Sequence, residues 1–199
     1  MDTLYQITEL LVSTATDDFG EKISHLEHAL QTYSYAKEHY PEDDELAVAG
    51  FWHDIGHSLY GSDGYDLMMS RDEVILGVHD HDKLAADILK DLLSKRCCAL
   101  IENHTMVKRY KAYKGDSLSE ASKETLELEG GLLTSSERLQ FEKHPLFSTL
   151  IKLRECDDAG KSTSFDYQQR GGKEILLLRA ISDTLKLHLD LQKIQSMMR

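Results

Sequence analysis

Apolar residues recur at spacings of three and four positions along most of this 199-residue chain, and only two prolines interrupt it. This spacing is the signature of amphipathic helices, and few prolines mean few enforced helix breaks. The pattern therefore predicts an all-α fold, with no segment that requires a strand. The segment 61–77, which has three glycines, is expected to be a mobile loop or a short helix. We expect helices at 2–15, 23–39, 43–58, 81–93, 95–112, 118–129, 134–144, 146–159 and 173–197.

The chain is long enough for one well-buried domain and short for two. We expect a single helical domain over residues 1–199, with a core at about 20–160 and a C-terminal helix at about 173–197. That helix is apolar enough to pack against the body of the domain or against a second subunit. A monomer and a homodimer both agree with the sequence.

Charge and composition exclude several classes of function. The formal net charge is −12, so the excess of Lys and Arg that drives binding to a nucleic-acid backbone is missing. No apolar run approaches the ~18 residues needed to span a bilayer, and the N-terminus lacks the pattern of a signal peptide. The three cysteines include the neighbours Cys97 and Cys98, which argues against a disulfide framework. We therefore expect a cytoplasmic protein with no nucleic-acid or membrane partner.

The stretch AVAGFWHDIGHSLYG, residues 47–61, places His53, Asp54 and His57 at the end of an apolar run. Unpaired charge is costly in such a place, so these side chains need partners. On one helix, His53 and His57 would lie ~40° apart and share a face, with Asp54 beside them. Further candidates from apolar helices are His28, His81, His104 and Asp157.

A single histidine on an amphipathic helix is more often a surface or hydrogen-bonded residue than a metal ligand. We assign that ordinary role to His25, His39, His79, His144 and His188. The seven residues above are different as a set, because a carboxylate can bridge two metals while imidazoles complete each coordination sphere. Such mixed ligands suit iron or manganese. The sequence therefore predicts a dinuclear metal site.

Basic and hydroxyl side chains follow the predicted ligands at helical spacing. Lys108 comes four residues after His104, on the same face, so its ammonium group can reach over a metal. Arg154 precedes Asp157 by three residues, and its guanidinium group can bind an anion in a bidentate manner. Ser122 and Thr125 could add hydroxyl groups. Each alone has the simpler interpretation of a solvent-exposed helix residue.

The order His28, His53-Asp54, His81, His104, Asp157 resembles the HD-domain superfamily of metal-dependent phosphohydrolases. A more specific similarity, to the phosphonate-degrading HD oxygenases, is carried by six motifs between about residues 20 and 161. In chain order these are GEKISHLEHALQ, HDIGH, HDKLAADIL, LIENHTMVKRY, LSEASKETLELEGG and KLRECDDAGK.

This resemblance implies two iron ions in a mixed-valence Fe(II)/Fe(III) state, with O2 as co-substrate. It assigns His28, His53, Asp54 and Asp157 to one iron and Asp54, His81 and His104 to the other, with Asp54 as the bridge and His53 and Asp54 central to catalysis. It also implies that phosphonate oxygens are bound by His57, Lys108, Ser122, Thr125 and Arg154, and that Glu21 faces an ammonium group of the substrate.

Two positions depart from the family pattern. Asp18 stands where the family has a tyrosine that ligates the second iron, so Asp18, Tyr60 and Tyr65 are candidates to replace it. Glu129 replaces a glutamine, and it would add negative charge near an anion site if it points inward.

The implied reaction is the oxidative cleavage of the carbon–phosphorus bond of a 2-amino-1-hydroxyethylphosphonate-type substrate, with or without N-methyl groups. Its products are phosphate and glycine or an N-substituted glycine. The alternative is an HD-type phosphohydrolase acting on a phosphate ester or a nucleotide, and Glu21 argues against it because such a substrate has no ammonium group. A sensor or scaffold with a degraded site would lack ligands, and none of the six is missing.

Overall fold

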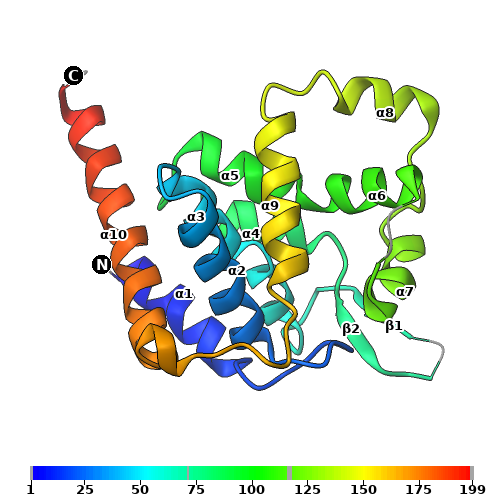
Figure 1. The fold of residues 1–199 in the computed structure, drawn as a ribbon, viewed down its shortest axis with the longest axis horizontal. Coiled ribbons are helices and arrows are strands. Elements are labelled where there is room, and N and C mark those ends of the chain that lie inside the picture. The colour runs from blue at the N-terminus through cyan, green and yellow to red at the C-terminus, as the bar shows by residue number, and fades with distance from the viewer. Residues whose placement is uncertain (1, 71, 116–117, 198–199) are drawn as a thin grey trace.

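The computed structural model describes residues 2–70, 72–115 and 118–197, so the predicted domain limits at 1 and 198–199 lie outside the described residues. Figure 1 shows a mostly helical fold, which confirms the predicted class. None of the described helices is both long and apolar enough to cross a bilayer. The α-helices are α1 (Asp2–Ser13), α2 (His25–His39), α3 (Asp44–Trp52), α4 (His81–Leu89), α5 (Lys95–Glu102), α6 (His104–Lys114), α7 (Glu120–Leu128), α8 (Ser135–Phe141), α9 (Phe147–Ala159) and α10 (Lys173–Met197).

Two predicted helices are divided in the structure. The predicted helix 43–58 becomes α3 and the 3-10 helix η1 (Ile55–Leu59), and the predicted helix 95–112 becomes α5 and α6. The breaks have a common backbone geometry, because Asp54 has φ −99° and ψ 5° while Asn103 has φ −107° and ψ 9°. Each break stands beside a candidate ligand, so the chain changes direction where ligands are presented. A second 3-10 helix, η2 (Gln168–Arg170), precedes α10.

The expectation of no strands is wrong between residues 61 and 78. β1 (Leu67–Met69) and β2 (Ile75–Val78) form an antiparallel two-stranded ribbon, in which Met68 pairs with Gly77. Each strand is too short to show a clear period of two in the sequence. Met68 points into the protein while its neighbours on β1 are exposed, which is the alternation expected of a strand.

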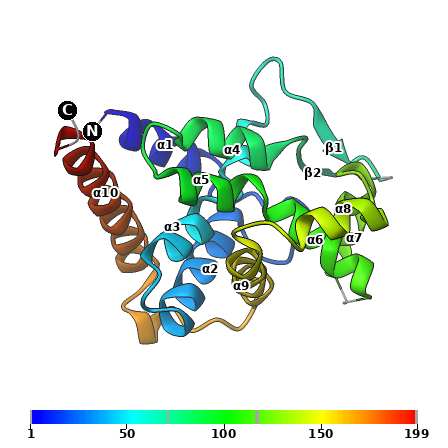
Figure 2. The ribbon, with the colours of Figure 1, turned by 90° about the horizontal axis from the view of Figure 1, so that it is seen from above.

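The core lies around α2 and α3, which pack against each other and against α5, α9 and α10. The α3 helix is apolar on all sides and fully buried from Leu46 to Trp52. The indole N–H of Trp52 donates to Thr184 Oγ1 of α10 at 3.0 Å, and this fixes α10 to the end of α3. In Figures 1 and 2, α10 lies on one side of the molecule, whereas α6, α7, α8 and the ribbon lie on the other.

Candidate metal centre and adjoining pocket

The six predicted ligands come from separate parts of the chain and meet in one cluster. All are buried except Asp54, whose side chain is 20% exposed. They are His28 in α2, His53 and Asp54 between α3 and η1, His81 and His104 at the first positions of α4 and α6, and Asp157 in the last turn of α9.

The break after α3 places His53 and His57 differently from the prediction. Because the helix ends before them, the two do not share one helix face. His53 faces the cluster, whereas the ring of His57 stacks on the ring of His81 with centroids 3.8 Å apart. Gly56 allows this packing, since a Cβ atom there would lie 2.1 Å from the carbonyl oxygen of His81. Any other residue would push η1 away from α4.

A first group of donor atoms lies on one side of Asp54. His28 Nε2 is 3.3 Å from His53 Nε2, 3.3 Å from Asp157 Oδ1 and 3.4 Å from Asp54 Oδ2. His53 Nε2 is 3.2 Å from the same oxygen of Asp54. These atoms surround one point.

A second group of donor atoms lies on the other side of Asp54. His81 Nε2 is 3.0 Å from His104 Nε2, and Asp54 Oδ1 is 3.6 Å from the first nitrogen and 3.3 Å from the second. Asp54 therefore presents one carboxylate oxygen to each group, which is the geometry of a carboxylate between two metals.

Backbone carbonyls orient three of the four imidazoles in these groups. The Nδ1 atoms of His28, His53 and His104 lie 2.9, 2.9 and 2.7 Å from the carbonyl oxygens of Gly160, Gly50 and Ile101. A carbonyl only accepts, so each Nδ1 carries the hydrogen and each Nε2 presents a lone pair to the cluster. This arrangement is typical of histidines that bind metals.

The facing lone pairs show that the cluster fits a cation. The Nε2 atoms of His28 and His53 point at each other across 3.3 Å, which is repulsive unless a positive charge lies between them. Without metal, a proton takes that role: burial alone would lower the pKa of His28, but Asp157 and Asp54 outweigh burial and raise it to about 9. Imidazoles and carboxylates together suit iron or manganese.

Unlike the three imidazoles held by carbonyls, His57 accepts a hydrogen bond at its Nδ1 atom. The backbone N–H of Val78 donates to His57 Nδ1 at 3.0 Å, so the hydrogen of the neutral ring is on Nε2. Burial holds the pKa of His57 well below its ordinary value, which keeps the ring neutral. Gly77 has φ +132°, and a Cβ atom there would lie 2.3 Å from His57 Nδ1. The ribbon thus fixes the tautomer of His57, whose Nε2 carries the hydrogen.

A cavity of about 500 Å³, open solvent at its mouth included, lies over the cluster, and all six residues predicted to bind substrate line it. They are Glu21, His57, Lys108, Ser122, Thr125 and Arg154. Phe19 and Leu76 form apolar parts of its wall.

The cations that line this cavity are paired with carboxylates. Lys108 Nζ forms an ion pair with Glu129 and donates to Thr125 Oγ1 at 2.9 Å. Arg154 lies 2.8 Å from Asp157 Oδ2 and 2.5 Å from Asp158 Oδ1. Glu129 therefore points inward, and Arg154 supports a candidate metal ligand.

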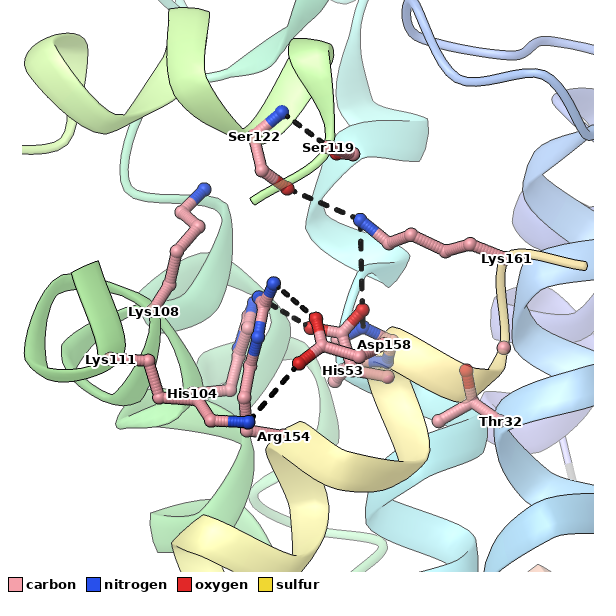
Figure 3. A network of polar contacts seen from close by, with 12 residues as sticks. Thr32, His53, His104, Lys108, Lys111, Ser119, Ser122, Arg154, Asp158 and Lys161 are labelled. Atoms are coloured by element: carbon pink, nitrogen blue, oxygen red, sulfur yellow. Dashed lines mark hydrogen bonds and ion pairs between the residues drawn. The ribbon is translucent and has the colours of Figure 1, made fainter. Parts of the chain in front are cut away.

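Lys161 is a pocket residue that the sequence analysis did not identify. Its ammonium group lies 2.7 Å from Glu21 Oε1 and 3.3 Å from Ser122 Oγ, and Figure 3 shows it reaching Ser122 from the segment after α9. It follows Asp157 by four residues, the same helical spacing that identified Lys108. The carboxylate of Glu21 thus has a cationic partner within the protein.

None of the three residues considered as replacements for the family tyrosine lines the cavity. Asp18 is exposed and accepts the backbone N–H of Gly20 at 3.0 Å, and Tyr65 is also exposed. Tyr60 hydrogen-bonds to Asp17. By their mutual distances, Asp54, His81 and His104 form the second group, and His57 also lies in a group with Asp54 and His81 whose donor atoms are within 4.8 Å of one another.

His25, to which we gave an ordinary hydrogen-bonded or surface role, is buried behind the cluster. Its Nδ1 atom is 3.2 Å from Thr14 Oγ1 and 3.4 Å from Ser58 Oγ, and the ring also hydrogen-bonds to the backbone of Asp54. Burial lowers its pKa to about 4, so the ring is neutral. His25 thus holds the segment that carries Asp54, and its position directly after the capping Ser24 gave no sign of this.

Comparison with known proteins agrees with this geometry. A model of the HD domain family matches residues 25–140. An uncharacterized protein of Acanthamoeba polyphaga mimivirus is 34% identical over 75% of this chain and 68% of its own length. Hydroxymethylphosphonate dioxygenase of Gimesia maris is 32% identical over 77% of this chain and 75% of its own length.

A third relative is the glycine-betaine-forming [1-hydroxy-2-(trimethylamino)ethyl]phosphonate dioxygenase of Leisingera caerulea, which is 31% identical over 74% of each chain. The fold and the His/Asp cluster define an HD-domain protein. Within that class, the chain belongs to the family that contains these phosphonate dioxygenases.

Proposed function

We propose that this protein is a di-iron dioxygenase that cleaves the carbon–phosphorus bond of a 1-hydroxyphosphonate. The observation that carries the proposal is the position of Asp54, whose two oxygens face two separate groups of imidazoles beneath a cavity lined by cations. The kinship with two phosphonate dioxygenases supports the same reaction class.

The donor groups divide the ligands between two metal positions. His28, His53, Asp54 and Asp157 would hold one iron, and Asp54, His81 and His104 would hold the other. These residues come from helices that share one core, and we propose that the chain is a single domain over 1–199. When bound, the irons would supply the one-electron chemistry that activates O2, in a mixed-valence Fe(II)/Fe(III) state.

The protein's own side chains bind and orient the substrate. The Nε2–H group of His57 would donate to a phosphonate oxygen, and Lys108, Arg154 and the hydroxyl groups of Ser122 and Thr125 would bind the others. Their placement would set the hydroxyl-bearing carbon over the metal cluster. Phe19 and Leu76 would exclude water from that carbon.

In the overall reaction one O2 is consumed for each substrate. The carbon–phosphorus bond and one carbon–hydrogen bond of the hydroxyl-bearing carbon are broken, that carbon becomes a carboxylate, and the phosphonate group leaves as phosphate. A 2-amino substituent would give glycine, and an N-methylated amine would give an N-substituted glycine. Glu21 would face that amine, in competition with Lys161.

The test is oxygen consumption and phosphate release by iron-loaded protein. The substrates are hydroxymethylphosphonate, 2-amino-1-hydroxyethylphosphonate and its N-methylated analogues. We expect phosphate and oxygen in a ratio of one to one with at least one of them. Hydrolysis of phosphate esters under argon, with no oxygen consumed on any hydroxyphosphonate, would instead establish the phosphohydrolase alternative.

A further inference from the structure

The charge of Lys108 is balanced inside the cavity. Lys108 lies on α6, and its ammonium group contacts Thr125 and Glu129, which come from α7 and its C-terminal cap. The side chains of Lys108 and Glu129 are only 9% and 7% exposed. Burial lowers the pKa of Lys108, and the carboxylate of Glu129 acts in the opposite direction. The two therefore form a buried ion pair.

The backbone that carries Glu129 is fixed in place. The N–H of Glu129 donates to Thr125 O at 2.9 Å, and the chain then turns through Gly130 and Gly131, both with positive φ. Arg109, the neighbour of Lys108, donates to the carbonyl oxygens of Gly131 and Gly130 at 2.8 and 3.1 Å. This double contact holds the turn against α6, so the carboxylate stays in the cavity wall.

Glu129 has unused capacity to accept a hydrogen bond. Its Oε2 atom is buried and binds the ammonium group of Lys108, and among the residues that the structure describes it has no further partner, so one of its two lone pairs stays open to a ligand. A buried carboxylate oxygen in a cavity wall is an acceptor for a ligand that brings a hydrogen.

An anion that approaches Lys108 meets this carboxylate. The same holds for the other two cations that line the cavity. Arg154 is paired with Asp157, and Lys161 is paired with Glu21. A fully ionised oxygen placed between Lys108 and Glu129 would be repelled by Glu129. A protonated oxygen would instead donate to it while its neighbours on the same phosphorus contact Lys108.

We propose that Glu129 is a specificity-determining residue that selects the singly protonated form of a phosphonate. The P–OH group would donate to Glu129, and an ionised oxygen would contact Lys108. This inference rests on the proposed function, because it takes the cavity to be the phosphonate pocket. It predicts discrimination between tetrahedral anions of similar size, one of which carries a proton and one of which does not.

The experiment compares the binding of inorganic phosphate and sulfate by calorimetry to iron-loaded protein under argon at neutral pH. Phosphate keeps at least one acidic proton there, and sulfate keeps none. We expect wild type to favour phosphate by about tenfold or more, the value of a hydrogen bond to a charged group. In Glu129→Gln that preference should fall at least severalfold, because an amide can also donate to sulfate.

The matched control is Glu127→Gln, which removes the same charge from an exposed position of the same helix and should keep the wild-type preference. The comparison of the two anions on wild type can overturn the inference by itself, so the inference stays testable even if Glu129→Gln folds poorly. An unchanged preference in Glu129→Gln would overturn it, as would equal binding of both anions, or of neither, by wild type. Oxygen consumption is not part of this experiment, so the dioxygenase proposal stands or falls separately.

Discussion

The two walls of the cavity are built on different principles. On the metal side, backbone carbonyls of α3, α5 and the C-terminal cap of α9 hold three of the four imidazoles, so each of these three rings has one orientation. On the opposite side, Lys108, Lys161 and Arg154 are long side chains that are held by carboxylates of other side chains. The first wall is fixed by the backbone, whereas the second depends on which charges pair.

This difference indicates which wall of the cavity tolerates substitutions. A metal ligand loses its function when it is displaced by a fraction of an ångström, and backbone anchors prevent such movement. Paired charges can exchange partners when a substrate arrives, so the second wall can change specificity while the metal cluster stays the same. The following variants test this contrast, from the largest expected effect to the smallest.

Asp54→Ala should empty both metal positions, because one carboxylate faces both groups. We expect iron content near zero, activity at background and an unchanged helical circular dichroism spectrum. Asp87→Ala, an exposed carboxylate on α4, is the control. Two irons per chain in Asp54→Ala would contradict the bridging position.

Arg154→Ala should affect both walls, because Arg154 lines the cavity and contacts Asp157 Oδ2 at 2.8 Å. Loss of a residue that orients a ligand costs about 10- to 100-fold in metal affinity, and substrate binding should weaken in addition. Iron titration and the Michaelis constant measure the two effects. A variant that keeps full iron affinity would show that Asp157 is held in place without Arg154.

His57→Gln should separate the donor role from metal binding. His57 presents an N–H group, so we expect two irons per chain and a Michaelis constant raised about 10- to 100-fold, for the loss of a hydrogen bond to a charged group. His53→Gln, in contrast, should lose iron. Should both variants lose iron equally, His57 would be a ligand and its assigned tautomer would be wrong.

Lys108→Ala should keep both irons and also raise the Michaelis constant about tenfold or more, because Glu129 is then left unpaired in the cavity wall. The thermal midpoint of unfolding should fall as well, since a buried carboxylate loses its partner. Lys114→Ala, from an exposed position on the same helix, controls for the loss of a lysine. An unchanged Michaelis constant would count against a phosphonate site on α6.

Glu21→Gln should have the smallest effect. If its carboxylate recognises a substrate ammonium group, removing the charge costs on the order of 1–3 kcal/mol of binding for an aminophosphonate and little for hydroxymethylphosphonate. Because Lys161 already neutralises Glu21, the lower end of that range is expected. The measurement is the ratio of kcat/KM for the two substrates, and a ratio equal to wild type would assign Glu21 to holding Lys161.

The metal cluster could be predicted from the sequence because its signals are local. A His-Asp pair at the end of an apolar helix and single histidines on other apolar helices need one another for burial, and their order along the chain carries the family resemblance that assigns them to two metals. The helical spacing also identified Lys108 and Arg154. All of these residues are near the cluster or line its cavity.

The features that the sequence did not predict depend on tertiary contacts. Neither a proline nor a glycine directly precedes the break at Asp54, so the sequence favours one helix where the structure has α3 and η1. The ribbon of β1 and β2 is too short to show periodicity, although it decides the tautomer of His57. The pairing of Lys161 with Glu21, 140 positions apart, likewise has no local signal.

The packing of α10 against α3 has a spectroscopic consequence. Trp52 is the only tryptophan in the chain, it is completely buried, and it directly precedes His53. Its indole is tied to Thr184, so the fluorophore has one environment and a fixed orientation. Iron at the neighbouring imidazole should quench this emission, and the intrinsic fluorescence of the protein would then report metal occupancy in real time without substrate or label.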